Sequence, residues 1–263
     1  MSILKVFIRL VFCMPKNRSK TTSDSCTIKA VLFDLDDTLF DYETCHQAAS
    51  KRIFEEIAKL TTTPFELVPL LFELAQKEVK MQLLGTAASH NKDLYFQKIF
   101  EKMSPQLKNQ IKPSHIIHIF DLYRKTFYRT ITKEKASIQL LKFLRKKGIK
   151  TGIVTDSSNY TQLKKMVKLG IGDLVDVMVS SEEAGMDKPH SSPFLLAIYK
   201  LGVRAEECIM VGDNIKRDIE GAQWLGIQGI WINRYHKESH GIFPLYTVET
   251  TDELYSLLQQ LIS

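Results

Sequence analysis

Short apolar runs alternate with amphipathic stretches along the second half of the chain. Four runs predict buried strands: 150–154, 175–179, 208–211 and 228–232. Each run follows a stretch with the apolar spacing of a helix: 137–147, 159–169, 192–201 and 216–225. A glycine directly follows each of these stretches, as expected at a helix C-terminus. The alternation predicts right-handed βαβ units in an α/β fold with a doubly wound parallel sheet, which a last helix around Leu254–Leu261 completes.

One further apolar run, IKAVLF at 28–33, stands far upstream and predicts another buried strand. Between it and the alternating half, from His46 to Tyr128, apolar residues recur at helical spacing, with breaks near 61–64, 85–91 and 104–113. We expect about four helices there. Because this block follows the carboxyl end of a strand, it should cover the crevice where open α/β sheets bind ligands.

The pattern therefore predicts three parts of the chain. Residues 28–42 and 131–263 form an α/β core domain, and residues 43–130 form an inserted α-helical cap domain. Residues 1–27 precede the first strand and are expected to be a disordered extension. A transit or targeting role, or a true start at Met14, stays open for this basic, Ser/Thr-rich segment.

Carboxylates and hydroxyls stand at the carboxyl ends of three predicted strands. The first strand is followed by Asp34, Asp36 and Thr38, the second by Thr155, and the fourth by Asp213, Asn214 and Asp218. Lys188 lies in a loop-like segment after the third strand. These groups should meet at one edge of the sheet, and such a concentration of acid needs a neutralising cation. Oxygen ligands favour a hard metal, so the sequence predicts Mg²⁺.

Composition excludes some classes of protein. Residues 1–28 carry a net charge of +4 out of a formal +6 for the chain, so the nearly neutral body gives no indication of nucleic acid as a partner. The four cysteines show no metal-type or paired spacing, which favours reduced thiols and a cytoplasmic location. No apolar run reaches the roughly 20 residues that span a membrane.

These motifs resemble those of the haloacid dehalogenase (HAD) superfamily, in the same order and on the same elements. The four matching segments are AVLFDLDDTL at 30–39, GIVTD at 152–156, the Lys188-Pro189 pair within 180–194, and VGDNIKRD at 211–218. The resemblance covers about residues 28–235. It implies a Rossmann-like HAD core with a helical cap inserted after the first motif.

The resemblance also implies roles for individual residues. Asp34 would be the nucleophile that forms an aspartyl-phosphate, and Asp36 the general acid/base. The metal ligands would be Asp34, the backbone carbonyl of Asp36, and Asp213. The phosphate-binding segment would contain Thr155, Asp156 and Lys188. Three further residues would position these groups without contacting the substrate themselves: Asp218, Asn214 and Thr38. Asp156 stands where many relatives have asparagine, and it could alter the preference for anionic leaving groups.

The second carboxylate, Asp36, argues for phosphoryl chemistry, because carbon–halogen cleavage needs no proton donor for its leaving group. The resemblance therefore implies an Mg²⁺-dependent phosphatase, a monomer or dimer, that hydrolyses a small phosphomonoester such as a nucleoside monophosphate or a sugar phosphate. Two alternatives stay open: a sugar phosphomutase of the same family, and a non-catalytic binding or regulatory protein on the same scaffold. His46 lies close enough after Asp34 to contact substrate. We interpret Asp37 as structural, and His115 and His118 as surface residues.

Overall fold

A computed structural model describes residues 27–103 and 111–262 of the chain. In the described part, six strands form one parallel sheet in the order β3-β2-β1-β4-β5-β6. The strands are Ala30–Phe33 (β1), Lys150–Thr155 (β2), Val177–Ser180 (β3), Cys208–Gly212 (β4), Gln228–Ile232 (β5) and Tyr246–Val248 (β6). Phe33 of β1 pairs with Ile153 of β2 and Val211 of β4, so the three strands end within two residues of one another.

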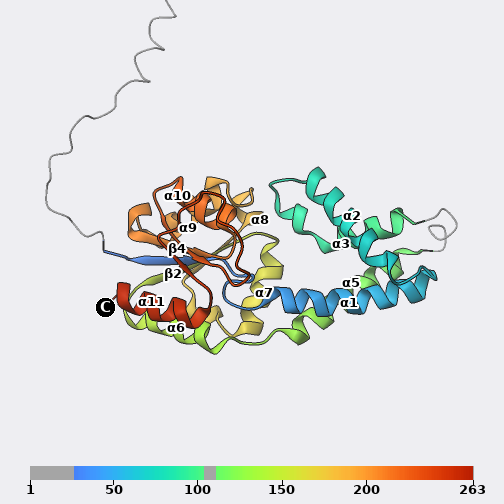
Figure 1. Cartoon of the computed structure of the whole chain (residues 1–263), viewed down its shortest axis with the longest axis horizontal. Helices are drawn as coiled ribbons and strands as arrows, with labels where there is room; N and C mark the ends of the chain where they lie inside the picture. Colours follow the sequence, from blue (N-terminus) through green and yellow to red (C-terminus); the bar gives the residue numbers. More distant parts are fainter. Residues whose placement is uncertain (1–26, 104–110, 263) are drawn as a thin grey trace, which may run out of the picture.

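Helices cover both faces of this sheet (Figure 1). They are Lys135–Lys146 (α6), Asn159–Leu169 (α7), Ser181–Ala184 (α8), Ser191–Leu201 (α9), Gly221–Gln223 (α10) and Thr251–Leu261 (α11). Side chains of β1 alternate between the faces, because successive residues of a strand point in opposite directions. Val31 and Phe33 belong to the core cluster that contains Leu144 of α6 and Leu258 of α11. Leu32 packs with residues of α9 on the other face.

The fold class predicted from the sequence is confirmed: a doubly wound parallel α/β sheet with inserted helices. Gly148, Gly170, Gly202 and Gly226 all have positive φ, the left-handed conformation that ends a helix. Four details differ from the prediction. Strand β6 was not expected, and the expected helix 216–225 is a π-helical turn, Ile215–Glu220 (η4), followed by the short α10. The strand expected at 175–179 is Val177–Ser180, and the short helix α8 lies in the segment expected to be a loop.

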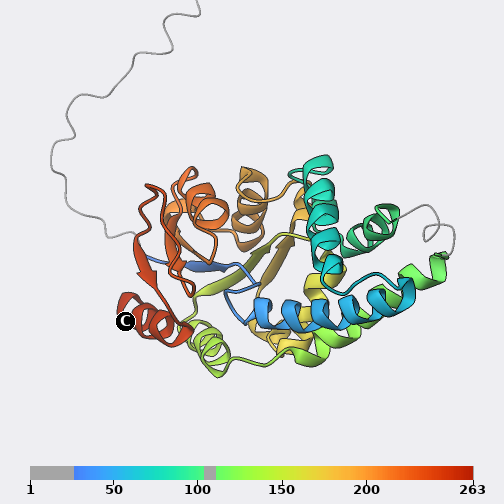
Figure 2. The same cartoon turned by 45° about the vertical axis from the view of Figure 1, so that its right-hand side comes forward.

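The described residues between 42 and 130 form helices and no strand. They are Tyr42–Thr61 (α1), Leu67–Gln82 (α2), the 3₁₀ turn Ala87–His90 (η1), Lys92–Glu101 (α3) and Pro113–Thr130 (α5). The long helices α1 and α5 lie side by side, with α2 and α3 beside them and the sheet at their end (Figure 2). The expected helical block is thus present, while its division from the core as a separate domain stays a prediction. The expected extension 1–27 lies outside the described residues apart from Thr27.

The helical block is joined to the sheet by the sharp loop after β1. Asp37 has a φ of +58°, and its Oδ1 accepts hydrogen bonds of 3.0 Å from the backbone amides of both Tyr42 and Glu43. These amides lie in the first turn of α1, where backbone donors lack partners within the helix. Asp37 therefore has the structural contact that we expected for it, and it fixes where α1 begins.

Candidate active site

Asp34 follows β1 directly, and its carboxylate is largely buried, with 7% of the residue exposed. The Lys188 Nζ lies 2.5 Å from Asp34 Oδ1 and 2.7 Å from Asp218 Oδ1. The same ammonium donates to the carbonyl of Val154 at 2.9 Å. Lys188, itself 2% exposed, therefore joins the ends of β1 and β2 to η4, the turn that follows β4.

The pKa values of this cluster reflect its burial. Burial raises the pKa of Asp34 well above its ordinary value, and the charge of Lys188 opposes that rise. Burial also disfavours the charged form of Lys188, but the Asp218 and Asp34 carboxylates outweigh this effect and hold the Lys188 pKa above its usual range. Lys188 is therefore protonated at neutral pH and favours the ionised carboxylate that a nucleophilic aspartate needs.

A third carboxylate, Asp213, completes the cluster. Burial, and then the neighbouring Asp218 carboxylate, raise the pKa of Asp213 to about 7. One carboxylate oxygen from each of Asp34, Asp213 and Asp218 lies within 4.8 Å of the others. The metal-ligand atoms that converge in this group are all carboxylate oxygens, and their charges face the Lys188 ammonium and, 3.5 Å from Asp213, that of the half-exposed Lys237. The donor set therefore fits a hard divalent cation such as Mg²⁺.

Asp36 is held by a lysine that sequence reasoning missed. The Nζ of Lys165 on α7 lies 2.8 Å from Asp36 Oδ1 and 2.5 Å from Oδ2. Lys165 is 3% exposed, and its Nζ also lies 5.0 Å from the centre of the Tyr42 ring. The sequence carried one signal for it: Lys165 falls on the apolar side of α7, next to Met166. A lysine in such a position needs a buried acidic partner.

The predicted phosphate-binding residues lie beside Asp34. Thr155 is buried at the end of β2, and its hydroxyl accepts a 2.8 Å hydrogen bond from the amide of Gln162. Asp156 Oδ1 accepts from the backbone N–H of Lys188 at 2.9 Å, and Oδ2 lies 3.3 Å from the Arg217 guanidinium. This geometry fits a role of Asp156 in positioning Lys188 and Arg217 better than direct contact with a phosphate, which its charge would repel.

The remaining supporting residues also lie near the cluster. Thr38 is buried and donates from its hydroxyl to Asp34 Oδ2 at 3.4 Å. The backbone N–H of Asn214 donates to Asp218 Oδ2 at 2.9 Å, and the Asn214 side chain caps η4 by accepting from the Arg217 amide. The wide turn of η4 thus begins at the residue that holds Asp218, and π-turns are frequent at functional sites.

A second acidic group lies where the helical block meets the core. The Asp187 carboxylate accepts from the Ser89 hydroxyl at 3.2 Å, and His90 Nε2 lies 3.1 Å from the same oxygen. The side chains of Asp156, Asp187 and His90 together have the spacing of a metal site. The Arg217 guanidinium, however, lies within 3.9 Å of both carboxylates and already supplies a positive charge. The contact therefore serves to hold η1 against the core.

The histidines separate into two groups. His46 lines the cavity above Asp34, and its Nδ1 lies 2.7 Å from the Tyr123 hydroxyl. Burial lowers the His46 pKa to about 3, so the ring is neutral at physiological pH. His115 hydrogen-bonds the backbone of Lys112, and the exposed His118 lies 3.2 Å from Glu56. Among the described residues, neither joins a group of possible metal ligands.

A cavity of about 430 Å³ opens above this cluster and is lined by Asp34, Asp36, Lys188, Asp213 and residues of the helical block. A parallel sheet with carboxylates at its strand ends, under a set of inserted helices, defines a capped α/β hydrolase. The family description "haloacid dehalogenase-like hydrolase" matches residues 28–226. The chain belongs to the haloacid dehalogenase-like hydrolases, and it is an enzyme of the phosphatase branch.

Individual proteins agree with this family. The chain is 33% identical to a ribulose-1,5-bisphosphate 5-phosphatase of Halopiger xanaduensis, over 76% of this chain and 83% of that protein. It is 29% identical to a glyceraldehyde 3-phosphate phosphatase of Pyrococcus furiosus, over 78% and 80% of the two chains. Among solved structures, a HAD phosphatase from Thermococcus onnurineus has the same fold, with a TM-score of 0.69, 24% identity and coverage of 88% and 98%. The resemblance seen in the sequence is confirmed.

No helix in the described part of the chain has both the length and the apolar character needed to cross a membrane.

Proposed function

We propose that the chain hydrolyses a phosphomonoester of a small metabolite, with Mg²⁺ and through an aspartyl-phosphate on Asp34. The observation that carries this proposal is the buried Asp34 carboxylate, which lies 2.5 Å from Lys188 where the ends of β1 and β2 meet the η4 turn. The relatives support the substrate class, because two of them are named for ribulose 1,5-bisphosphate and glyceraldehyde 3-phosphate.

The chain's own residues divide the reaction between them. Asp34 attacks phosphorus in line with the leaving oxygen, and Lys188 neutralises charge on the transferring group. Thr155, which is among the residues that line the same cavity, hydrogen-bonds a phosphoryl oxygen. Asp36 first donates a proton to the leaving oxygen and then takes one from the water that cleaves the intermediate. Before substrate enters, Lys165 holds Asp36 in one orientation.

Asp34, Asp213 and the Asp36 carbonyl are the groups that would hold Mg²⁺, with Asp218 positioning Lys188 beside them. When bound, the cation supplies positive charge that offsets repulsion between the carboxylates and the substrate phosphate. Asp218 is already engaged by the Lys188 ammonium at 2.7 Å, which suits a supporting rather than a ligating role.

The direct test is turnover of the purified chain with p-nitrophenyl phosphate and a panel of small phosphomonoesters. We expect release of inorganic phosphate that requires Mg²⁺ and stops when EDTA is added. A chain that interconverts sugar phosphate isomers without releasing phosphate would instead be a phosphomutase. Absence of turnover with the whole panel would contradict the proposed function.

Asp213→Asn tests the metal assignment. The amide lacks the charge of the carboxylate, so the Mg²⁺ concentration that gives half-maximal rate should rise by at least about tenfold. Asp173→Asn, an exposed acid of the core, is the matched control and should leave that concentration unchanged. An unaltered Mg²⁺ dependence in Asp213→Asn would place the metal elsewhere.

Lys165→Met tests whether the lysine positions Asp36. We expect turnover of an alkyl phosphate to fall by about 10- to 100-fold, which is less than the ~10²–10⁴ that loss of a proton donor itself costs. Nitrophenyl phosphate, whose leaving group needs little protonation, should be affected less, and Lys165→Arg should restore part of the rate. Equal losses with both substrates would show that Lys165 acts on the fold alone. Lys168→Met, exposed on the same helix, serves as the control.

A further inference from the structure

A second cavity, of about 360 Å³, continues from the site toward the helical block. It shares Asp36, Tyr42 and Lys92 with the cavity above Asp34, so the two spaces meet at the expected proton donor. The leaving group of a phosphomonoester begins at the oxygen that this donor protonates. The second cavity is therefore the space into which the rest of the substrate extends.

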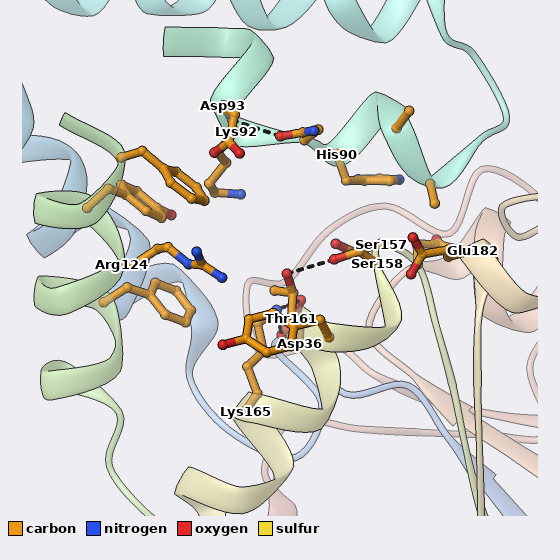
Figure 3. Close-up of a pocket in the computed structure, with 18 of the residues that line it drawn as sticks. Asp36, His90, Lys92, Asp93, Arg124, Ser157, Ser158, Thr161, Lys165 and Glu182 are labelled. Carbon is orange, nitrogen blue, oxygen red and sulfur yellow. Dashed lines mark hydrogen bonds and ion pairs between the residues drawn. The ribbon is translucent and has the colours of Figure 1, made fainter. Parts of the chain in front are cut away.

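Two cations of the helical block point into this space (Figure 3). Lys92 stands at the start of α3, and its Nζ lies 5.6 Å from the ring centres of both Tyr42 and Tyr123. Within residues 27–103 and 111–262, no carboxylate lies within ion-pair distance of this ammonium. Burial lowers the Lys92 pKa to about 8, an effect that Asp36 opposes, so the ammonium is still charged at neutral pH.

The second cation, Arg124 of α5, reaches across the cavity. Its guanidinium carbon lies 4.5 Å from the centre of the Phe120 ring and 5.4 Å from that of Tyr160 on α7. The rings hold the planar group in place while leaving its N–H donors free of carboxylate partners in the described structure. Arg124 is therefore preorganised for an oxyanion that enters between α5 and α7.

Three acids of the same cavity do not cancel these charges. Asp36 is paired with Lys165, and Asp156 with Arg217 and the Lys188 amide. Glu182 lies at an exposed position, where solvent screens its charge, and it accepts a 2.7 Å hydrogen bond from the backbone of Asn159.

Asp93 is the acid that opposes the two cations. Burial raises its pKa, while Arg124 lowers it. Its Oδ1 is buried and has no hydrogen-bond partner among the described residues. A buried carboxylate oxygen of this kind lacks a donor, and a substrate hydroxyl would supply one. Even with Asp93 ionised, the cations on this wall outnumber the unpaired acid.

We propose that Lys92 and Arg124 bind a second oxyanion on the leaving group and that Asp93 accepts a hydrogen bond from a hydroxyl between the two ends. The substrate class is then a hydroxylated metabolite with a phosphomonoester at one end and a phosphate or carboxylate at the other. This inference rests on the proposed function and specifies its substrate. A cavity of this size suits a group of a few carbons, and the partly buried charge of Lys92, which has no carboxylate in ion-pair contact, is compensated when the anion binds.

The test compares substrates that differ only in this group. Glycerol 3-phosphate and 3-phosphoglycerate differ by a carboxylate, and ribulose 5-phosphate and ribulose 1,5-bisphosphate by a phosphate. We expect kcat/KM for the more anionic member of at least one pair to be higher by tenfold or more, on the order of one charge-assisted hydrogen bond. The pair with the larger ratio identifies the oxyanion as carboxylate or phosphate.

Lys92→Gln and Arg124→Gln should each reduce that ratio by about 10- to 100-fold. The ratio cancels any loss of rate common to both substrates. Lys125→Gln, exposed beside Arg124 on α5, should leave it unchanged. The same comparison can be made by binding. The Asp34→Asn protein, which should not turn over substrate, is titrated with 3-phosphoglycerate or ribulose 1,5-bisphosphate, and the dissociation constants are measured.

Four results would overturn the inference. Turnover with equal kcat/KM within both pairs, or ratios that the two variants do not alter, would contradict it while leaving the proposed function intact. A preference for nucleoside monophosphates would show that the aromatic walls bind a base instead. Absence of turnover with every substrate would refute the proposed function, and the inference with it.

Discussion

We expect the Asp34→Asn variant to lose essentially all turnover. The amide is a poor nucleophile, and it removes the charge that Lys188 holds at 2.5 Å. Asp36→Asn instead keeps the nucleophile and should lose on the order of 10² to 10⁴ in rate, with a smaller loss for nitrophenyl phosphate, whose leaving group needs little protonation. The two substitutions are therefore expected to impair turnover in different ways.

Trapping of the phosphoenzyme distinguishes the effects of these two substitutions. With a labelled substrate, Asp36→Asn should accumulate an acid-stable, hydroxylamine-sensitive aspartyl-phosphate, because water lacks its base. Asp34→Asn should carry no label. Phosphate found on Asp34→Asn, or on a histidine of either variant, would contradict the mechanism and leave the family assignment standing.

The second large effect is expected for Lys188→Met, which removes the cation between Asp34 and Asp218. Removing one partner of a buried ion pair leaves an uncompensated charge and costs about 3–5 kcal/mol of unfolding free energy. Activity should also disappear, since Asp34 then has no partner that favours its ionised form. Urea unfolding and turnover measure the two effects.

Lys200→Met is the matched control for that experiment. Lys200 pairs with Glu183, but both side chains are substantially exposed, and such pairs contribute about 0–1 kcal/mol. A Lys188→Met protein as stable and active as the control would show that the buried triad of Asp34, Lys188 and Asp218 has no role in stability or catalysis.

The sequence predicted the fold well because its signals are local. Buried parallel strands require continuous apolar runs, and helix ends in left-handed conformation favour glycine, so β2, β4 and β5 were each predicted within one residue of their bounds. Strand β6 has three residues, of which Tyr246 and Thr247 are exposed, so no apolar run marks it. The π-turn at η4 depends on the tertiary contacts of Asp218, which periodicity does not report.

The sequence places at the site residues that follow a strand, either directly or, as for Lys188 and Asp218, after a short segment. Asp34, Thr155 and Asp213 come directly at strand ends, and parallel pairing brings such residues together wherever they fall in the sequence. Lys165 and Lys92 lie on helices instead. Which polar residue of a helix faces the cavity depends on how the helix packs against its neighbours. The spacing of apolar residues in the sequence does not determine that packing. Their roles therefore required the structure.

The carboxylates of the catalytic cluster and the cations of the second cavity come from different segments of the chain. The carboxylates of the cluster follow strands of the sheet, whereas Lys92 and Arg124 belong to the helices inserted between β1 and α6. Substitutions on α3 or α5 can therefore change what the second cavity accepts without moving Asp34 or Lys188. In evolutionary terms, natural selection can act on the choice of substrate and on the chemical step as separate traits, and descendants of one ancestral catalyst can acquire new substrates through changes in the inserted helices alone.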